Sequence, residues 1–136
     1  MENQIIIRYG WLKGMYIYTI LGAGFSGLGM ILMPKTYSSL FNFPIQEPVN
    51  FEILGSVYLA FGLISILGLR SPLKFVPILM AEITYKMIWF TGVILPLILK
   101  GQFPQYALIN IIIFATFIIG NAIAIPFKYI FNKQLT

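Results

Sequence analysis

Four long apolar runs constrain this chain more than any other feature, because each is long enough to cross a lipid bilayer. A helix needs roughly 17–25 mostly apolar residues to span the hydrocarbon core of a membrane. A segment in lipid must also satisfy its own backbone hydrogen bonds, which a helix does. The sequence therefore predicts an all-α integral membrane protein with helices at about residues 12–33, 51–69, 75–99 and 104–127.

The composition of the chain limits the classes of function that it can have. The chain is 59% hydrophobic and only 10% charged, whereas a soluble domain carries about 25% charged residues. It contains no Cys and no His, which removes thiolate catalysis, disulfides and the usual transition-metal ligands. We expect no metal site and no cofactor. An enzyme is the least favoured class, although a desolvated lysine amine can still act as a nucleophile or base.

Loop lengths and charges predict the topology. Only the loop at residues 34–50 is long, and short loops make neighbouring helices antiparallel, so we expect one antiparallel four-helix domain over residues 1–136. Cytoplasmic loops of membrane proteins are enriched in Lys and Arg. Six basic residues fall on the side of the termini and two on the other: Arg8, Lys13, Arg70, Lys74, Lys128 and Lys133 against Lys35 and Lys100. This bias places both termini in the cytoplasm and the protein in the inner membrane.

These charges sit mostly at the ends of the apolar runs. That distribution is typical of anchors at the membrane interface and not of a nucleic-acid-binding face. Residues 1–10 are not expected to form a cleavable signal, because an acid and amides precede the first apolar run.

The long loop is too aromatic for a solvated linker, since it carries Tyr37, Phe41 and Phe43. Residues 35–41 are predicted to form a short helix in the outer headgroup layer, or else a hydrophobic cap over the mouth of the bundle. Pro44 and Pro48 favour an extended chain over the rest of the loop.

Glycine and proline residues interrupt the apolar runs. The stretch Gly22–Gly27 matches the dinucleotide-binding pattern G-x-G-x-x-G, but that fingerprint requires a preceding strand and a helix in water. In the middle of a membrane helix it indicates close helix packing instead. Pro96, inside the third run, removes a backbone donor and is expected to bend that helix.

Two charged residues, Glu82 and Lys86, lie inside the third apolar run. A charge at mid-membrane costs about 2.5–3.5 kcal/mol on insertion scales, so such residues face a protein interior or a wet cavity. Residues four apart share one helix face, and Glu before Lys is the favoured order for an ion pair. Three interpretations follow: a neutralised pair that holds helices together, a binding or transport site, or a contact with another subunit.

Polar residues on the other helices are predicted to meet this pair in a narrow slot, open to the outer side with Lys86 at its floor. Asn110 and Asn121 share one face of the fourth helix, and the alternative for both is ordinary interhelical hydrogen bonding, worth about 0.6 kcal/mol. The candidate ligand-binding residues are Lys86, Glu82, Trp89, Tyr18, Asn110, Asn121 and Glu52.

Residues 24–89 also carry a resemblance to a known family. The residues responsible are the glycine-rich helix ending at Pro34, the segments Phe41–Pro44, Glu52–Gly55 and Tyr58–Gly62, and the segment Ile83–Trp89. This half of the chain resembles the DoxX-like superfamily of small four-helix membrane proteins. The resemblance implies a four-helix fold; some members are associated with quinone-linked redox systems. Distant eukaryotic relatives bind sterol-like or cationic lipophilic ligands through acids within their helices, and Glu52 occupies a comparable place.

The leading hypothesis is a small membrane protein that binds a lipophilic or anionic molecule, such as a lipid or a quinone, around Lys86 and Glu82. One alternative is an accessory subunit whose charged pair docks onto a membrane partner or a second copy of the chain. A further alternative is a small proton-coupled transporter. The expected partners are membrane lipid, a small lipophilic molecule and a homo-oligomer or membrane complex, and not nucleic acid.

Overall fold

The computed structural model describes residues 5–44 and 47–132, and within these ranges the chain is helical with no strand. Lys133, which contributes to the predicted charge bias, lies outside the described residues. The four long helices are formed in order by α1 (Tyr9–Thr19) with α2 (Phe25–Leu32), by α4 (Pro48–Arg70), by α5 (Val76–Trp89) with α6 (Leu95–Leu99), and by α7 (Ala107–Ala124). Two short helices, α3 (Pro34–Leu40) and α8 (Phe127–Phe131), complete the chain.

The prediction of four membrane-length helices is confirmed. The segments Tyr9–Leu32, Pro48–Arg70, Val76–Leu99 and Ala107–Ala124 are long and apolar enough to cross a membrane. The fourth helix is shorter than the predicted residues 104–127. It ends at Ala124 because Pro126 disfavours the helical conformation of the residue before it, and Ile125 is extended with ψ 123°.

Two of the long helices contain one turn of π-helix each, and the sequence did not predict either turn. The turn Ile20–Gly24 joins α1 to α2, and the turn Phe90–Ile94 joins α5 to α6. At the second turn the Leu95 N–H bonds to the Phe90 carbonyl, five residues back. Pro96 follows directly and has no N–H to donate, so the predicted disturbance at Pro96 takes the form of a widened turn.

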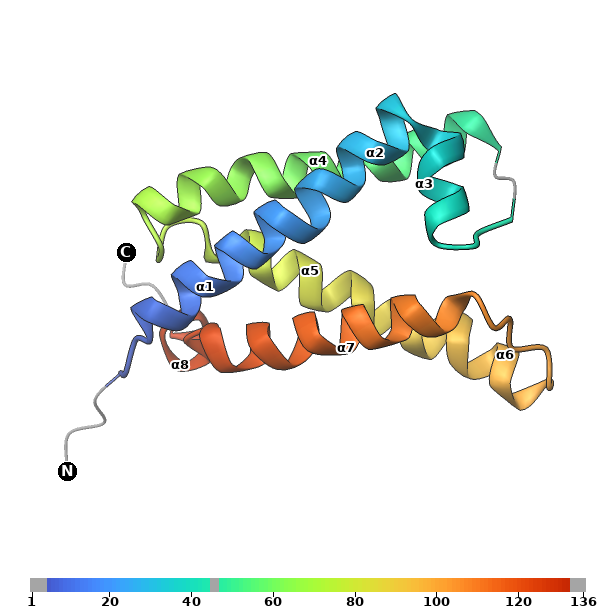
Figure 1. Ribbon diagram of the computed structural model, residues 1–136. Helices are drawn as coiled ribbons and strands as arrows, with labels where there is room; N and C mark the ends of the chain where they lie inside the picture. Colours follow the sequence, from blue (N-terminus) through green and yellow to red (C-terminus); the bar gives the residue numbers. More distant parts are fainter. Residues whose placement is uncertain (1–4, 45–46, 133–136) are drawn as a thin grey trace.

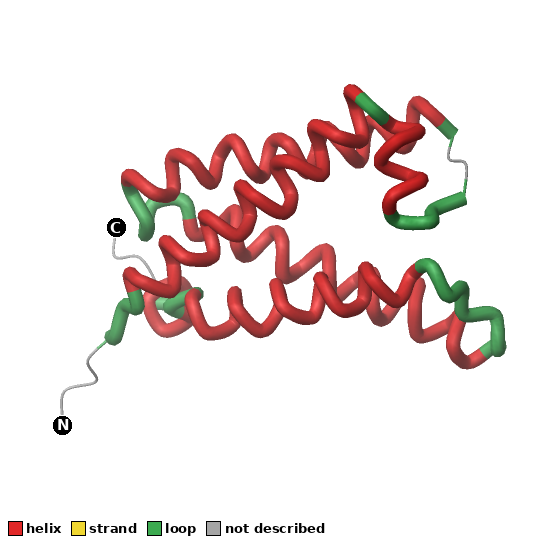
Figure 2. The backbone as a smooth tube through the Cα atoms, in the orientation of Figure 1, coloured by secondary structure: helices red, strands yellow, loops and turns green. Residues whose placement is uncertain are grey.

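The helices form two layers (Figure 1). The pair α1–α2 packs on α4, α5 packs on α7, and α1 also contacts α7. Loops are confined to the two ends of the molecule (Figure 2). The end with α8 also holds the described start of the chain and the turn between α4 and α5, while α3 and α6 lie at the opposite end.

Glycines allow the first two long helices to approach closely. A Cβ placed on Gly62 would lie 2.6 Å from the Gly24 Cα, and one placed on Gly27 would collide with the Gly55 carbonyl. The stretch Gly22–Gly27 is thus a packing surface, as its position in an apolar run predicted.

The most tightly packed part of the bundle lies toward the α8 end. Its buried cluster comprises Leu12, Met15, Tyr16, Val76, Leu79, Phe117, Ala124 and Ile125. The Tyr16 hydroxyl donates a hydrogen bond of 2.6 Å to the Pro72 carbonyl in the turn after α4. The two cavities described below lie beyond this cluster, toward α3.

The predicted short helix after Pro34 is present as α3, and its aromatic side chain packs over the bundle. The Tyr37 ring lies 4.7 Å from Phe41, 6.2 Å from Phe43 and 6.2 Å from Phe51 at the start of α4. Phe43 in turn meets Tyr106, just before α7, edge to face at 5.9 Å. The aromatic loop therefore caps this end and connects the two layers.

Candidate functional site

Lys86 is buried in the centre of the bundle, with only 2% of its surface exposed. Its ammonium donates a hydrogen bond of 2.9 Å to the Tyr85 hydroxyl. The nitrogen also lies over three aromatic rings, 4.3 Å from the centre of Tyr85, 4.4 Å from Phe117 and 5.0 Å from Phe114. Aromatic faces attract cations, most strongly where water is excluded, so this surrounding suits a positive charge. The prediction that Lys86 turns inward is confirmed.

Glu82 is also fully buried, but its partner differs from the predicted one. The Asn121 amide donates to Glu82 Oε2 at 3.1 Å and lies 3.5 Å from the Leu79 carbonyl. The Thr19 hydroxyl of α1 also interacts with the carboxyl group. Among the described residues no direct ion pair joins Glu82 to Lys86, although the two side chains are one helical turn apart. The predicted ion pair is wrong, because Glu82 binds Asn121 of α7 while Lys86 binds the adjacent Tyr85 and lies over two rings of α7.

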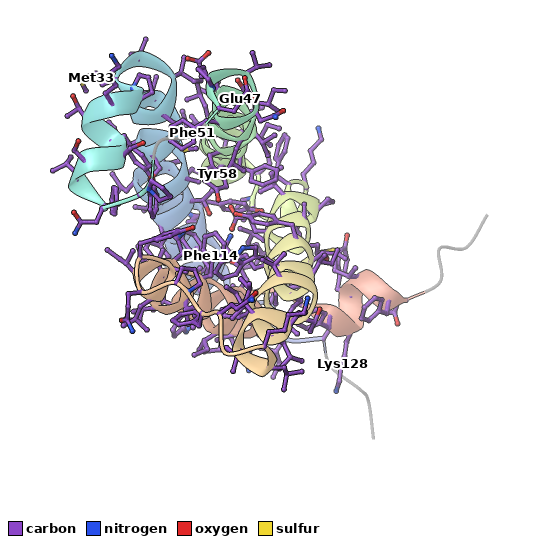
Figure 3. The ribbon with its side chains drawn as sticks, turned by 90° about the vertical axis from the view of Figure 1, so that its right-hand side faces the viewer. Met33, Glu47, Phe51, Tyr58, Phe114 and Lys128 are labelled. Carbon is purple, nitrogen blue, oxygen red and sulfur yellow. The ribbon has the colours of Figure 1, made fainter. Side chains whose placement is uncertain are left out.

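Lys86 forms part of the wall of a cavity of about 100 Å³ between the two layers. Most of the lining is aromatic or small, with a few polar tips. The lining residues are Gly22, Ala23, Ser26, Tyr37, Phe41, Tyr58, Tyr85, Lys86, Asn110, Ile113, Phe114 and Phe117. Figure 3 looks into the bundle from the α3 end, where Tyr58 of α4 and Phe114 of α7 lie between the layers.

A second cavity of about 150 Å³ lies beside the first, toward α3. The two share Tyr37, Tyr58 and Asn110, while the second adds an apolar wall of Met30, Phe43, Phe51, Leu54 and Tyr106. The arrangement offers an inner chamber with Lys86 in its wall and an outer chamber under the aromatic cap.

Tyrosine hydroxyls line the route between the chambers. The Tyr58 side chain is hydrogen-bonded to Tyr85, which accepts from Lys86, and Tyr37 is hydrogen-bonded to Ser26. In α3, burial raises the pKa of Tyr37, against a smaller lowering by its bond to Ser26. Tyr37 is therefore a neutral phenol at physiological pH, able to donate or accept a hydrogen bond.

The structure brings some predicted site residues together and separates others. Asn110 lines the inner chamber together with Lys86, as predicted, and it also lines the outer chamber. Asn121 contacts Glu82 outside the two chambers. Trp89 lies against the ring of Phe114, at 5.0 Å, and does not line either chamber.

Tyr18 and Glu52 were predicted to line the slot, but neither of them lines a chamber. Tyr18 stacks on Phe117 at 4.0 Å and its hydroxyl hydrogen-bonds Thr116 at 2.6 Å, so it lies on the other side of that ring from Lys86. Its neighbour Thr19, about 100° around the helix, faces Glu82 instead. Glu52 is half-buried near the start of α4 and lines neither chamber.

Sequence reasoning did not select Tyr37, Tyr58, Tyr85 or Thr19 as site residues. Tyr58 and Tyr85 carried a usable signal, because they are polar-tipped residues near the middle of apolar runs and Tyr85 adjoins Lys86. Tyr37 joins the site because α3 folds over the bundle, as the predicted hydrophobic cap required, but the cap was not connected to the slot in the sequence analysis.

Comparison with known proteins gives no match: no family model, no curated protein and no solved structure resembles this chain closely enough to be assigned. The resemblance to the DoxX-like superfamily stays a prediction. What the chain itself establishes is an all-helical protein with four helices that are long and apolar enough to cross a membrane.

Proposed function

We propose that this protein binds a small lipophilic molecule with an anionic or electron-rich oxygen group inside its helical bundle, with Lys86 as the recognition residue. The observation that carries this proposal is a buried ammonium group in the wall of an aromatic cavity. A buried charge that only held helices together would not need open space beside it.

The hydrogen-bonding capacity of Lys86 supports this proposal. An ammonium group carries three donors, and within the described residues the Tyr85 hydroxyl accepts one of them. The remaining donors are available to a carbonyl, carboxylate or phosphate oxygen in the inner chamber. Asn110 supplies a further polar group in the same lining.

Cavity size supports a ligand no larger than a single ring or a compact headgroup in each chamber. A cavity of about 150 Å³ accommodates benzene in a well-studied engineered case, and the two chambers here measure about 100 and 150 Å³. A lipid headgroup or a quinone ring would place its oxygen at Lys86 and its apolar part among the rings of the outer chamber. This ligand class also agrees with the expected DoxX-like kinship.

We also propose a membrane topology for the protein. The protein is an antiparallel bundle in the inner membrane with both termini in the cytoplasm, because basic residues cluster on the side of the termini. Arg8, Arg70 and Lys128 lie at the ends of described helices on that side. The chamber with Tyr37 and Phe43 then opens near the outer surface.

The alternative of an accessory subunit whose charged pair docks onto a partner has less support. It required Glu82 and Lys86 to meet a partner helix, but these residues are 0% and 2% exposed within a single chain. Native mass spectrometry from mild detergent separates the two possibilities: a lone protomer with a retained small molecule favours binding, and a stoichiometric protein partner favours the subunit.

The direct test compares thermal unfolding of the purified protein with two probes, a short-chain phosphatidic acid and a short-chain ubiquinone analogue. We expect at least one probe to raise the melting temperature of the native protein and to leave Lys86→Met unchanged. Lys100→Met is the matched control, because Lys100 is exposed at the end of α6, and it should keep the full shift. An equal shift in Lys86→Met would contradict the proposal.

A further inference from the structure

A second buried polar cluster lies one turn from Lys86 and outside both chambers. Three helices form it: Thr19 comes from α1, Glu82 from α5 and Asn121 from α7, and all three are 0% exposed. Two oxygens in it lack a hydrogen-bond partner among the described residues, Glu82 Oε1 and Asn121 Oδ1. Unsatisfied buried acceptors are uncommon in folded proteins and call for an explanation.

Both unpaired atoms are acceptors, and the Thr19 hydroxyl beside them already donates to the Met15 carbonyl at 2.9 Å, so the cluster lacks a further donor. The Asn121 amide nitrogen already donates to Glu82 Oε2 at 3.1 Å. An ionised carboxylate can only accept, whereas a protonated one carries an O–H donor. A proton on Glu82 Oε1 would let the acid donate to Asn121 Oδ1 while Oε2 accepts from the amide. One proton therefore satisfies both oxygens and closes a two-point acid–amide pair.

The other titratable groups around Glu82 do not supply this donor. From α1, the Tyr16 hydroxyl donates to the Pro72 carbonyl. On α5, Lys86 donates to Tyr85 and forms no ion pair with Glu82, and the contact from α7 is Asn121, which does not titrate. Glu82 lines neither chamber, so these cavities offer no room for a hydrated cation beside it.

We infer that Glu82 and Asn121 form a proton-binding site, in which Glu82 takes one proton from water on Oε1 and is neutral in the folded protein. Lys86 is then the one charged side chain among the described buried residues. Its charge is not cancelled by Glu82 and is available to an anion. This inference rests on the proposed function and makes it more specific. The ligand in the inner chamber is anionic, and loss of the Glu82 proton at alkaline pH weakens the binding of that ligand.

Infrared spectroscopy of the lipid-reconstituted protein at neutral pH tests the proton site without any ligand. The chain has four acidic residues, Glu2, Glu47, Glu52 and Glu82, so the carbonyl band of a protonated carboxylic acid is easily assigned. We expect one such band, shifted by exchange into D₂O, present in the native protein and in Glu52→Gln but absent from Glu82→Gln. Absence of the band from the native protein, or its survival in Glu82→Gln, would overturn the inference.

A second measurement addresses the link to the ligand. Titration of short-chain phosphatidic acid should show weaker binding as pH rises in the native protein, and the neutral isostere Glu82→Gln should retain binding with a smaller pH dependence, because position 82 then gains no negative charge. The same pH dependence in Glu82→Gln would contradict the link. If the infrared band is present and neither protein binds the probe, the proton site stands and the proposed function fails, so the two failures are distinguishable.

Discussion

At the scale of single residues, the bundle gives separate partners to two ionisable groups that the sequence places on one helix face. Lys86 is surrounded by three aromatic rings and a phenol, while Glu82 is held by an amide from α7. Each arrangement offsets part of the cost of placing a charged or polar group at membrane depth. Separation also leaves both groups chemically available, which a mutual ion pair would not.

The hydrogen bond to Glu82 makes a measurable prediction. Asn121→Ala removes the donor to Glu82 Oε2, and we expect the free energy of unfolding to fall by about 1 kcal/mol, within the range of buried hydrogen bonds in membrane proteins. Equilibrium unfolding of the purified protein in mixed micelles measures this. Asn110→Ala, which alters the cavity lining instead, should cost less; equal losses would contradict the assignment.

The sequence predicted the inward direction of Glu82 and Lys86 and the contact of Asn121 with this pair, but not their other partners. Burial follows from the cost of exposing charge to lipid, which is a property of the residue type. The partners depend on helix rotation, and one residue changes the direction by 100°. Thr19 therefore faces Glu82 where Tyr18 was expected, and Phe117 separates Tyr18 from Lys86.

At the scale of elements, glycine contacts fix how α2 and α4 meet. Gly24 and Gly62 bring their backbones together without intervening side chains. Lipid gives no hydrophobic drive for helix association, so such close packing is a main stabilising contribution. Sequence could identify this small-residue face but not the two π-helical turns, whose formation depends on tertiary context.

Gly62→Ala tests this contact. The added Cβ would lie 2.6 Å from the Gly24 backbone, and we expect a loss of about 1–3 kcal/mol in unfolding free energy, typical of overpacking. Gly14→Ala is the matched control, because nothing lies within 4 Å of its Cβ position. Thermal unfolding should show a lowered melting temperature for the first variant and little change for the second. Similar behaviour of the two would contradict the packing.

The start of α4 predicts a pH dependence. Glu47 caps this helix by accepting from the Asn50 and Val49 N–H groups at 2.8 and 3.0 Å, and these bonds lower its pKa. A lowered pKa in the folded state means that the cap stabilises above the ordinary pKa of a glutamate and weakens as pH falls through the folded value. Glu47→Ala should therefore lower the melting temperature at pH 7, and the difference from the native protein should shrink in acid. A constant difference would contradict the role of the charge.

At the scale of the whole molecule, the buried cluster and the two chambers lie toward different ends of the bundle. The buried cluster around Tyr16 and Leu79 closes the bundle near the turn after α4, while the chambers lie toward α3. The hydrophobic runs predicted the number of spans, but the cap by α3 arises from long-range aromatic contacts such as Phe43 with Tyr106. Under the proposed function, the ligand would therefore lie on the α3 side of the buried cluster.

The proposed orientation can be tested because the chain contains no Cys. Single cysteines at the exposed positions Lys100 and Lys128 lie at opposite ends of the bundle. We expect Lys100→Cys to react with a membrane-impermeant maleimide in intact cells whose outer barrier is opened, and Lys128→Cys to react only after the inner membrane is permeabilised. The reverse pattern would place the termini outside.

The most direct measurement of the central claim is an experimental structure of the protein extracted in its native lipid. We expect non-protein density within hydrogen-bonding distance of Lys86 Nζ, bounded by the rings of Tyr85, Phe114 and Phe117. A bundle in which Lys86 pairs with Glu82 and the inner chamber is closed by side chains would contradict it.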